Sequence, residues 1–296
     1  MSQQLFKYKT RYILVDFFAL SIVIPFVSLL FIDSIDELTK PFSFAYNIIH
    51  IIFFCSLCWA IICRFKSCGV DVKQIVGSLG LKKIPWLVLF IVFYGEQTIS
   101  SGVRYLEYYF YNFFNPEFIQ SSVNTLKEGG NYSSAGIFSQ IAQYLLLFIV
   151  LVVVAPVTEE FIFRGVLMHR WAVKWGALSS VILSSLLFGA IHVDAFWFSR
   201  AIGSIFFALF YIRTRNLIVP IILHALNNGL AFVELLFNNF NPATDSAIDV
   251  THQYLWYGLV NILLAIPILI YFLKFPKIFA ELPYFANKNR SELNQN

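Results

Sequence analysis

The sequence predicts an all-α integral membrane protein, a polytopic bundle of about eight transmembrane helices. Hydrophobic residues make up 58% of the 296 residues and charged residues only 13%, whereas a soluble globular protein has about 25% charged residues. The mean hydropathy is +0.71, and the apolar residues gather in runs long enough to cross a bilayer. This composition excludes a disordered chain, a disulfide-rich secreted fold and a nucleic-acid-binding domain.

Eight segments meet the requirement of about 20 mainly apolar residues for a transmembrane helix. The fourth is longer than one span and contains Pro156, where we expect a kink. No repeat or linker separates the segments, so residues 1–296 are expected to form a single integral membrane domain. The segments are residues 12–32, 44–63, 85–110, 138–172, 177–193, 199–213, 216–237 and 253–273.

Basic residues predict the orientation of these helices. Lys7, Lys9 and Arg11 precede a first apolar run that is too long for a signal peptide and has no cleavage site, so we expect it to be retained. With both termini in the cytoplasm, the cytoplasmic segments hold most of the 21 Lys and Arg residues, as the positive-inside rule requires. Residue usage favours a bacterial plasma membrane. The four cysteines, all between Cys55 and Cys68, are expected to be inert helix residues.

Ionisable and polar residues within the predicted spans mark a functional site, because burying them in a membrane is costly. Three short patches hold them: residues 158–165, 188–192 and 224–228. Measured from the predicted cytoplasmic ends of their helices at 1.5 Å per residue, all three lie about 14–22 Å deep. Carboxylates, imidazoles and an amide are therefore expected at a similar level in the membrane.

The spacing within the first patch predicts different roles for its two glutamates. Glu160 and Arg164 are four residues apart with the acid first, which is the favourable order for a helical ion pair. Glu159 points about 100° away from Glu160 and has only apolar residues four positions before and after it. We therefore expect Glu160 and Arg164 to support the site and Glu159 to act as a general base.

The other two patches complete a predicted peptide-hydrolysis site that uses water as its nucleophile. His224 and Asn228 are four residues apart, so they share one helix face and could together donate hydrogen bonds to an oxyanion. His192 would be a second base or proton carrier. The structural alternatives are an ion pair for Glu160 and Arg164, packing for His192, and contacts between helices for Asn228.

Ionisable residues outside these patches are expected to have structural roles. The predicted spans contain four of them, and these should be structural or interfacial. Three more lie near the ends of spans and should be solvated. The first group is Asp16, His50, Glu96 and Glu234, and the second is His169, Asp194 and His252.

At these patches the sequence resembles the CPBP family of intramembrane proteases, also called the Abi or CAAX-protease and bacteriocin-processing family. The family motifs EExxxR, FxxxH and HxxxN stand here, in this order, as Glu159–Arg164, Phe188–His192 and His224–Asn228. The likeness covers about residues 155–232, which would form the catalytic core. The neighbouring Arg215-Asn216 departs from the Thr-Gly that the family often has, a change expected to affect only a loop.

The resemblance implies an intramembrane cavity in which Glu159 activates water with help from His192. His224 and Asn228 would be the oxyanion donors, and Glu160 with Arg164 would be support. The family has been described as metal-dependent, and in that case Glu159, His192 and His224 would ligate zinc. No HExxH motif is present, so a glutamate mechanism without a cofactor is favoured.

The implied partners are the lipid bilayer and a membrane-associated peptide or protein. The family's substrates include prenylated CAAX-type proteins and bacteriocin or pheromone precursors. A non-catalytic membrane scaffold, such as a bacteriocin self-immunity protein, is the alternative. A proton-coupled transporter would also hold Glu and His in the membrane, but it would usually show repeated halves, which this sequence lacks. Alanine at Glu159 separates these classes, because a scaffold would keep its phenotype and a protease would lose it.

Overall fold

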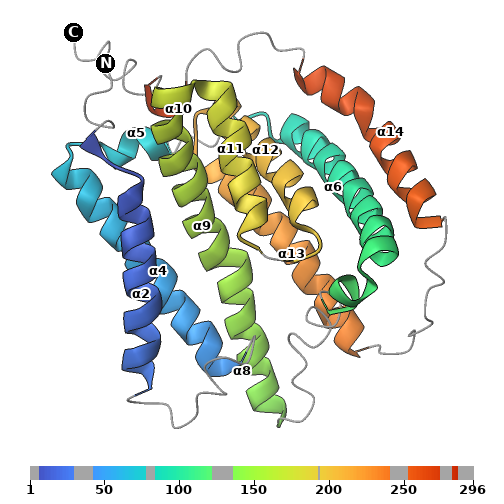
Figure 1. The fold of residues 1–296 in the computed structure, drawn as a ribbon, viewed down its shortest axis with the longest axis horizontal. Coiled ribbons are helices and arrows are strands. Elements are labelled where there is room, and N and C mark those ends of the chain that lie inside the picture. Colours follow the sequence, from blue (N-terminus) through green and yellow to red (C-terminus); the bar gives the residue numbers. More distant parts are fainter. Residues whose placement is uncertain are drawn as a thin grey trace. The chain divides into compact units, whose positions relative to one another are not determined.

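The structure is a computed structural model that describes residues 7–29, 43–77, 84–121, 136–192, 194–240, 253–273 and 282–285. Within these ranges it is helical and contains no strand (Figure 1). The α-helices are α2 (Arg11–Ser28), α4 (Phe44–Ser67), α5 (Val72–Val76), α6 (Trp86–Phe114), α8 (Ile137–Phe148), α9 (Ala155–Glu160), α10 (His169–Trp175), α11 (Ala177–Ala190), α12 (Trp197–Thr214), α13 (Ile218–Phe240) and α14 (Gln253–Leu273). Two π-helical stretches, η2 (Ile149–Val154) and η3 (Phe161–Met168), separate α8, α9 and α10.

Every predicted span is found as a helix, and the structure confirms a helical membrane protein. Five helices are long and apolar enough to cross a membrane: Arg11–Ser28, Phe44–Ser67, Trp86–Phe114, Ile137–Trp175 and Ile218–Phe237. Ala177–Ala190 and Gln253–Ile268 are apolar but shorter. Eight spans, both termini in the cytoplasm and a bacterial plasma membrane stay predictions.

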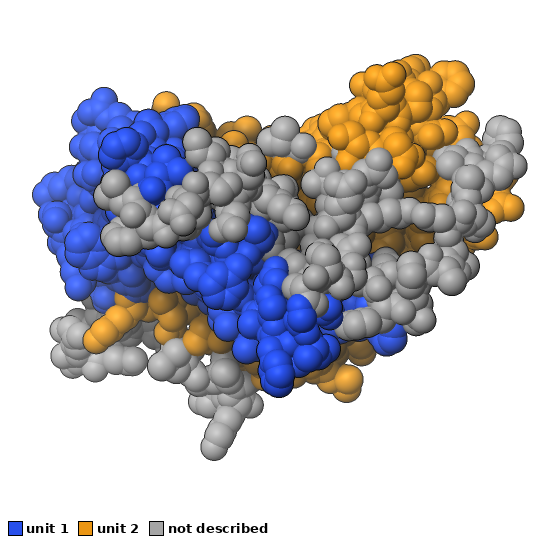
Figure 2. All heavy atoms as spheres, turned by 90° about the horizontal axis from the view of Figure 1, so that it is seen from below, with its two compact units in different colours: residues 1–72, 125–162, 224–242 blue, residues 73–124, 163–223, 243–296 orange. Residues whose placement is uncertain are grey.

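The chain separates into two compact units, coloured in Figure 2. Unit 1 contains residues 1–72, 125–162 and 224–242, and unit 2 contains residues 73–124, 163–223 and 243–296. The helix from Ile137 to Trp175 and helix α13 each belong partly to one unit and partly to the other. The single membrane domain expected over residues 1–296 stays a prediction.

Unit 1 is built on α4, which packs against α2, α8, η2 and α9. Asp16 of α2 accepts two hydrogen bonds from the guanidinium of Arg64 on α4, at 2.7 and 2.5 Å. The Arg64 guanidinium also lies over the ring of Tyr12, 5.1 Å from its centre. Asp16, for which we expected a structural role, therefore joins α2 to α4.

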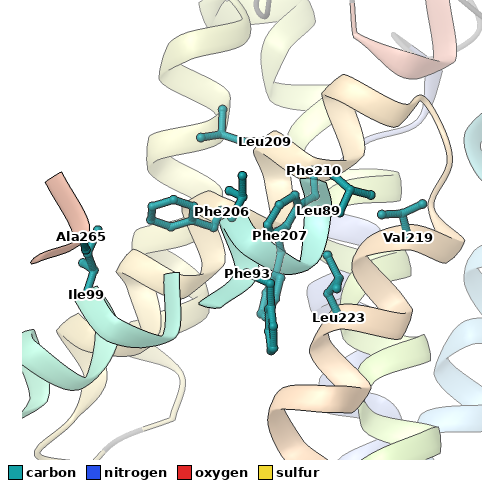
Figure 3. Packing of buried hydrophobic residues seen from close by; sticks show 11 residues of the cluster. Leu89, Phe93, Ile99, Phe206, Phe207, Leu209, Phe210, Val219, Leu223 and Ala265 are labelled. Atoms are coloured by element: carbon teal, nitrogen blue, oxygen red, sulfur yellow. The ribbon is translucent and has the colours of Figure 1, made fainter. Parts of the chain in front are cut away.

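Unit 2 is held by the packing of α6 against α12 and α14 and of α11 against α10 and α12. Its core is an apolar cluster to which α6, α12, α14 and the first turns of α13 contribute (Figure 3). Gly102 and Gly258 allow α6 and α14 to approach closely, since a Cβ atom on Gly102 would lie 2.9 Å from the carbonyl oxygen of Gly258. The cluster consists of Leu89, Val92, Phe93, Ile99, Phe206, Phe207, Leu209, Phe210, Val219, Leu223 and Ala265.

The longest helix carries the first motif. It runs from Ile137 to Trp175 without interruption. It therefore continues past Pro156, as the predicted depth of the first motif in the membrane requires. Its irregularity takes the form of π-helical turns on both sides of α9, and such turns are frequent at functional sites. The helix therefore carries Glu159 and Glu160 on a short α-helical segment between two wider ones.

Candidate active site

The predicted site residues are divided between the two units. Glu159, Glu160, His224 and Asn228 belong to unit 1, whereas Arg164 and His192 belong to unit 2. Because the two groups lie in different units, the meeting of His192 with Glu159 stays a prediction.

In unit 1, Glu160 holds the imidazole of His224. The Nδ1 atom of His224 lies 2.9 Å from Oε1 of Glu160, and the Glu160 side chain is fully buried while that of His224 is 5% exposed. A carboxylate can only accept a hydrogen bond, so Nδ1 is the donor. This contact fixes both the orientation and the tautomer of the ring, as carboxylates do for catalytic and metal-bound histidines.

The other nitrogen of the His224 ring faces Glu159. Nε2 lies 3.8 Å from Oε2 of Glu159, whose side chain is 17% exposed. This distance is too long for a direct hydrogen bond, but both atoms could contact one water molecule placed between them. Of the two glutamates, the more accessible one is therefore the one predicted to act as the base.

Asn228 is oriented by the backbone of the π-helix η2. In η2 each N–H binds the carbonyl five residues earlier, and Ala155 accordingly donates to Val150. The next donor in this series would be residue 156, which is a proline without an N–H. Its partner, the Leu151 carbonyl, accepts a hydrogen bond from Nδ2 of Asn228 instead, at 2.8 Å. Pro156 thus explains why an amide is held at this point of the unit.

In unit 2, Arg164 is fully buried among the side chains of α11 and α12. Its Nη2 atom donates hydrogen bonds to the backbone carbonyl and to Oγ of Ser204, at 2.9 and 2.8 Å. Its guanidinium lies 5.0 Å from the ring centre of Phe188 and 5.6 Å from that of Phe207. Phe188 of the second motif therefore contacts the arginine of the first motif through a cation–π interaction.

His192 also has a defined orientation in unit 2. Its Nδ1 atom donates to the backbone carbonyl of Phe188 at 2.7 Å, since a carbonyl oxygen can only accept. The centres of the His192 and Phe188 rings lie 4.8 Å apart. With the proton on Nδ1, Nε2 is the nitrogen that can accept a proton, as the predicted role of His192 requires.

The prediction that His169 is solvated was wrong. Its ring is fully buried because the wide turns of η3 leave carbonyls for it to bind: Nδ1 contacts the carbonyls of Arg164 and Gly165 at 2.8 and 3.1 Å. The backbone N–H of Tyr284 donates to Nε2 at 3.1 Å. Tyr284 lies far away in the sequence, so the helical pattern gave no signal of this contact. His252 lies outside the described residues.

Metal binding receives no direct support from this geometry. Among the residues that the structure describes, no group of three or more His, Cys, Asp or Glu side chains is arranged to hold a metal ion. Glu159 and His224 of unit 1 could supply two of the three predicted zinc ligands, and His192 lies in the other unit. Zinc therefore stays an alternative.

Comparison with known proteins identifies the part of the chain that bears the motifs. Residues 141–230, which contain all three motifs, match the family described as type II CAAX prenyl endopeptidase Rce1-like. The chain is also 32% identical over 125 residues to the membrane-embedded CAAX protease MroQ of Staphylococcus aureus (strain USA300). Over 90 residues it is 32% identical to YdiL of Bacillus subtilis (strain 168), a proposed membrane peptidase.

These matches are partial. They cover 39% of this chain and 51% of MroQ, and 30% of this chain and 36% of YdiL. The chain thus spans about half or less of the length of these relatives. No solved structure matches the chain. The match to residues 141–230 nevertheless includes every residue of the three motifs, so the resemblance on which the site was predicted is confirmed for this part of the chain, which is similar to the Rce1-like CAAX proteases.

Proposed function

We propose that this protein is an intramembrane endopeptidase that hydrolyses a peptide bond of a membrane-associated substrate with an activated water molecule. The observation that carries the proposal is the arrangement around His224. Glu160 fixes its ring from one side at 2.9 Å, and Glu159 faces the opposite nitrogen at 3.8 Å. A carboxylate and an imidazole directed at one point are the groups that deprotonate water in general-base catalysis.

In the proposed reaction Glu159 takes a proton from the water, and the oxygen of the water forms a bond with the carbonyl carbon of the scissile peptide. The resulting oxyanion would be bound by Asn228 and His224. The contact with Leu151 uses one of the two N–H groups of the Asn228 amide, and the other would serve the oxyanion. His192 would carry the proton to the departing amine nitrogen as the carbon–nitrogen bond breaks.

The contact with Glu160 sets a condition on the role of His224. Because Nδ1 already donates to Glu160, donation from Nε2 to an oxyanion needs a second proton on the ring. With a single proton, Nε2 can only accept, and it would then share the attacking water with Glu159. Glutamine in place of His224 distinguishes these roles, because its amide N–H can replace a donor but cannot accept a proton in the reaction.

The proposed substrate rests on the resemblance to the CAAX-type proteases. We propose a prenylated CAAX-type protein or a bacteriocin or pheromone precursor, which would reach the site from the lipid or from the cytoplasmic surface. In the alternative function, the chain is a scaffold that confers self-immunity without cleaving anything. It would use the same buried charges only to hold its helices together.

A cleavage assay in liposomes tests the proposal. The wild type would be compared with Glu159→Ala, His192→Ala and His224→Gln, using a prenylated CAAX peptide and a bacteriocin precursor that carries its leader, each with and without a chelator. Glu234→Ala is the matched control, because Glu234 is an exposed carboxylate of α13 in unit 1. We expect Glu159→Ala and His192→Ala to abolish cleavage and Glu234→Ala to leave it unchanged.

The remaining outcomes separate the alternatives. Loss of cleavage with the chelator and recovery with zinc would replace the glutamate mechanism by a metal-dependent one. A wild type that cleaves neither substrate, combined with a Glu159→Ala variant that keeps the cellular phenotype, would overturn the protease and support the scaffold.

A further inference from the structure

Glu107 of α6 is a buried carboxylate for which the proposed reaction has no use. It is 8% exposed, and both of its carboxylate oxygens are engaged by the start of α12. The backbone N–H of Phe198 donates to Oε1 at 2.7 Å, and that of Ser199 donates to Oε2 at 3.1 Å. All of these residues belong to unit 2.

This contact caps α12 from outside its own sequence. The first N–H groups of a helix have no partner within it and favour a negative charge. The N-cap residue of α12 is Phe196, which makes no side-chain capping bond. Glu107 supplies this cap from a position more than 90 residues away in the chain, and so fixes where α12 begins.

The beginning of α12 in turn lies directly against the end of α11, which the turn containing His192 follows. A Cβ atom on Gly189 would lie 2.2 Å from the carbonyl oxygen of Trp197 and 2.9 Å from Cβ of Ala201. The backbone N–H of His192 donates to the Gly189 carbonyl at 3.1 Å. Any shift of the first turn of α12 would therefore displace the turn that contains His192.

Further contacts join α6 to the residues that lead from α11 into the first turn of α12. Nε1 of Trp197 donates to the hydroxyl of Tyr111 at 3.2 Å, and the Arg104 guanidinium lies 5.8 Å from the ring centre of Phe196. Asp194 accepts a hydrogen bond from the backbone of Phe196 at 2.9 Å. Asp194 and Glu107 thus both bring a negative charge to the start of α12, Asp194 from the residues just before the helix and Glu107 from α6.

We propose that Glu107 is a positioning residue for His192: it caps the first turn of α12, and this turn holds the end of α11, directly before the turn in which His192 lies. The importance of this positioning for catalysis rests on the proposed function, whereas the positioning itself does not. Small displacements of a catalytic group can lower a rate by about 100-fold. Loss of the contact with Glu107 should therefore change both the position of His192 and the rate of peptide cleavage.

Two measurements on the full-length protein in detergent test this role. The first is the NMR spectrum of the imidazole groups in protein labelled at its five histidines, with His192→Gln and His224→Gln used for assignment. The second is the kinetics of peptide cleavage. The variants are Glu107→Gln, Glu107→Ala and Gly189→Ala, which disturb the same contact region from α6 and from α11.

Glu96→Gln is the matched control. Glu96 is also a buried carboxylate of α6, 2% exposed, and it accepts hydrogen bonds from Gln97 and Ser100 of its own helix. This control separates the loss of any buried charge on α6 from the loss of the cap on α12.

We expect Glu107→Ala and Gly189→Ala to shift or broaden the signal of His192 and to leave that of His224 unchanged, with a smaller effect for Glu107→Gln because it keeps one carbonyl acceptor. The kcat for peptide cleavage should fall about 10- to 100-fold in Glu107→Ala, with little change in KM. Glu96→Gln should change neither the signal nor the kcat.

An unchanged His192 signal in both Glu107→Ala and Gly189→Ala, or an equal shift in Glu96→Gln, would overturn the positioning role. A His192 signal that moves as expected in a wild type that cleaves no peptide would leave the positioning intact and count against the proposed function alone. If Glu107→Ala does not fold, Glu107→Gln and Gly189→Ala still decide the question.

Discussion

The two units stabilise buried charges in different ways. In unit 1, the Glu160 carboxylate contacts an imidazole of another helix, so the contact changes with the protonation of that ring. In unit 2, the contacts described for the Arg164 guanidinium are a serine hydroxyl, a backbone carbonyl and two aromatic faces. Of these two buried charges, that of Glu160 lies against a ring that can exchange protons, whereas that of Arg164 is itself permanent, in a unit that also contains the titratable His192, Glu96 and Glu107.

Removing the carboxylate of Glu160 should give the largest effect. Deleting one partner of a buried ion pair lowers the free energy of unfolding by about 3–5 kcal/mol, because the other partner stays buried without an opposite charge. Glu160→Ala should therefore lower the free energy of unfolding by about this amount, and Glu160→Gln by less, since its amide oxygen can still accept from Nδ1 of His224. The midpoint of unfolding in detergent measures both. Equal effects of alanine and glutamine would show that the charge, and not the hydrogen bond, is what matters.

Arg164→Lys tests the contrasting surroundings in unit 2. Lysine keeps the positive charge but lacks the planar group that lies against Phe188 and Phe207, so we expect a loss of about 2–3 kcal/mol in the free energy of unfolding. Arg213→Lys is the control, because Arg213 is an exposed arginine of α12 and its replacement should have little effect. If both variants unfold at the wild-type midpoint, charge alone is sufficient in unit 2.

Asn228→Ala tests a neutral contact in unit 1. The variant leaves the Leu151 carbonyl without the amide donor that replaces the missing N–H of Pro156, and we expect a loss of about 1–2 kcal/mol. Thermal unfolding of Asn228→Ala and of the double variant Asn228→Ala, Pro156→Ala gives the measurement. Restoring an N–H at residue 156 should recover part of the loss, and the absence of any recovery would show that proline is not the reason for the contact.

Asp16→Asn should give the smallest effect. The side chain of Arg64, its partner, is 40% exposed, and exposed ion pairs contribute about 0.2–1 kcal/mol.

Burial, with a further contribution from the Asp16 carboxylate, raises the pKa of the neighbouring Tyr8 phenol above its ordinary value. The stability gained from neutral Tyr8 is therefore present below about pH 10 and is lost as the pH rises further. An unfolding midpoint of Asp16→Asn far below that of the wild type at neutral pH would contradict the small effect of the ion pair, and a wild-type midpoint that stays constant up to alkaline pH would contradict the role of Tyr8.

Sequence patterns predicted the helices well because each apolar run is long and polar at its ends. They also brought Glu159, Glu160 and His224 together correctly, through equal depth on different helices. They could not predict that Glu160 would contact His224, since spacing along one helix reveals only neighbours three or four residues away. The cap that Glu107 places on α12 was missed for the same reason.

The π-helical turns were also beyond sequence patterns. A run such as residues 149–154 is apolar at every position, so it carries no periodicity from which the width of the turn could be read. The burial of His169 depends on such turns and could not be foreseen without them. The expectation that Arg215 affects only a loop agrees with its position after the end of α12, where it adopts a left-handed conformation with a φ of 53°.

The two π-helical stretches also make the length of this helix a functional quantity. Each wide turn accommodates one residue more than an α-helix would, and it exposes a carbonyl that another side chain binds: Asn228 at Leu151, and His169 at Arg164. Deleting a single residue from residues 149–154 would remove this extra residue, so that the turn could close to regular α-helical winding with later side chains in place, whereas the same deletion in a regular helix would rotate them by about 100°. The carbonyl that Asn228 binds would then be lost to a regular turn, although every residue of the three motifs would still be present.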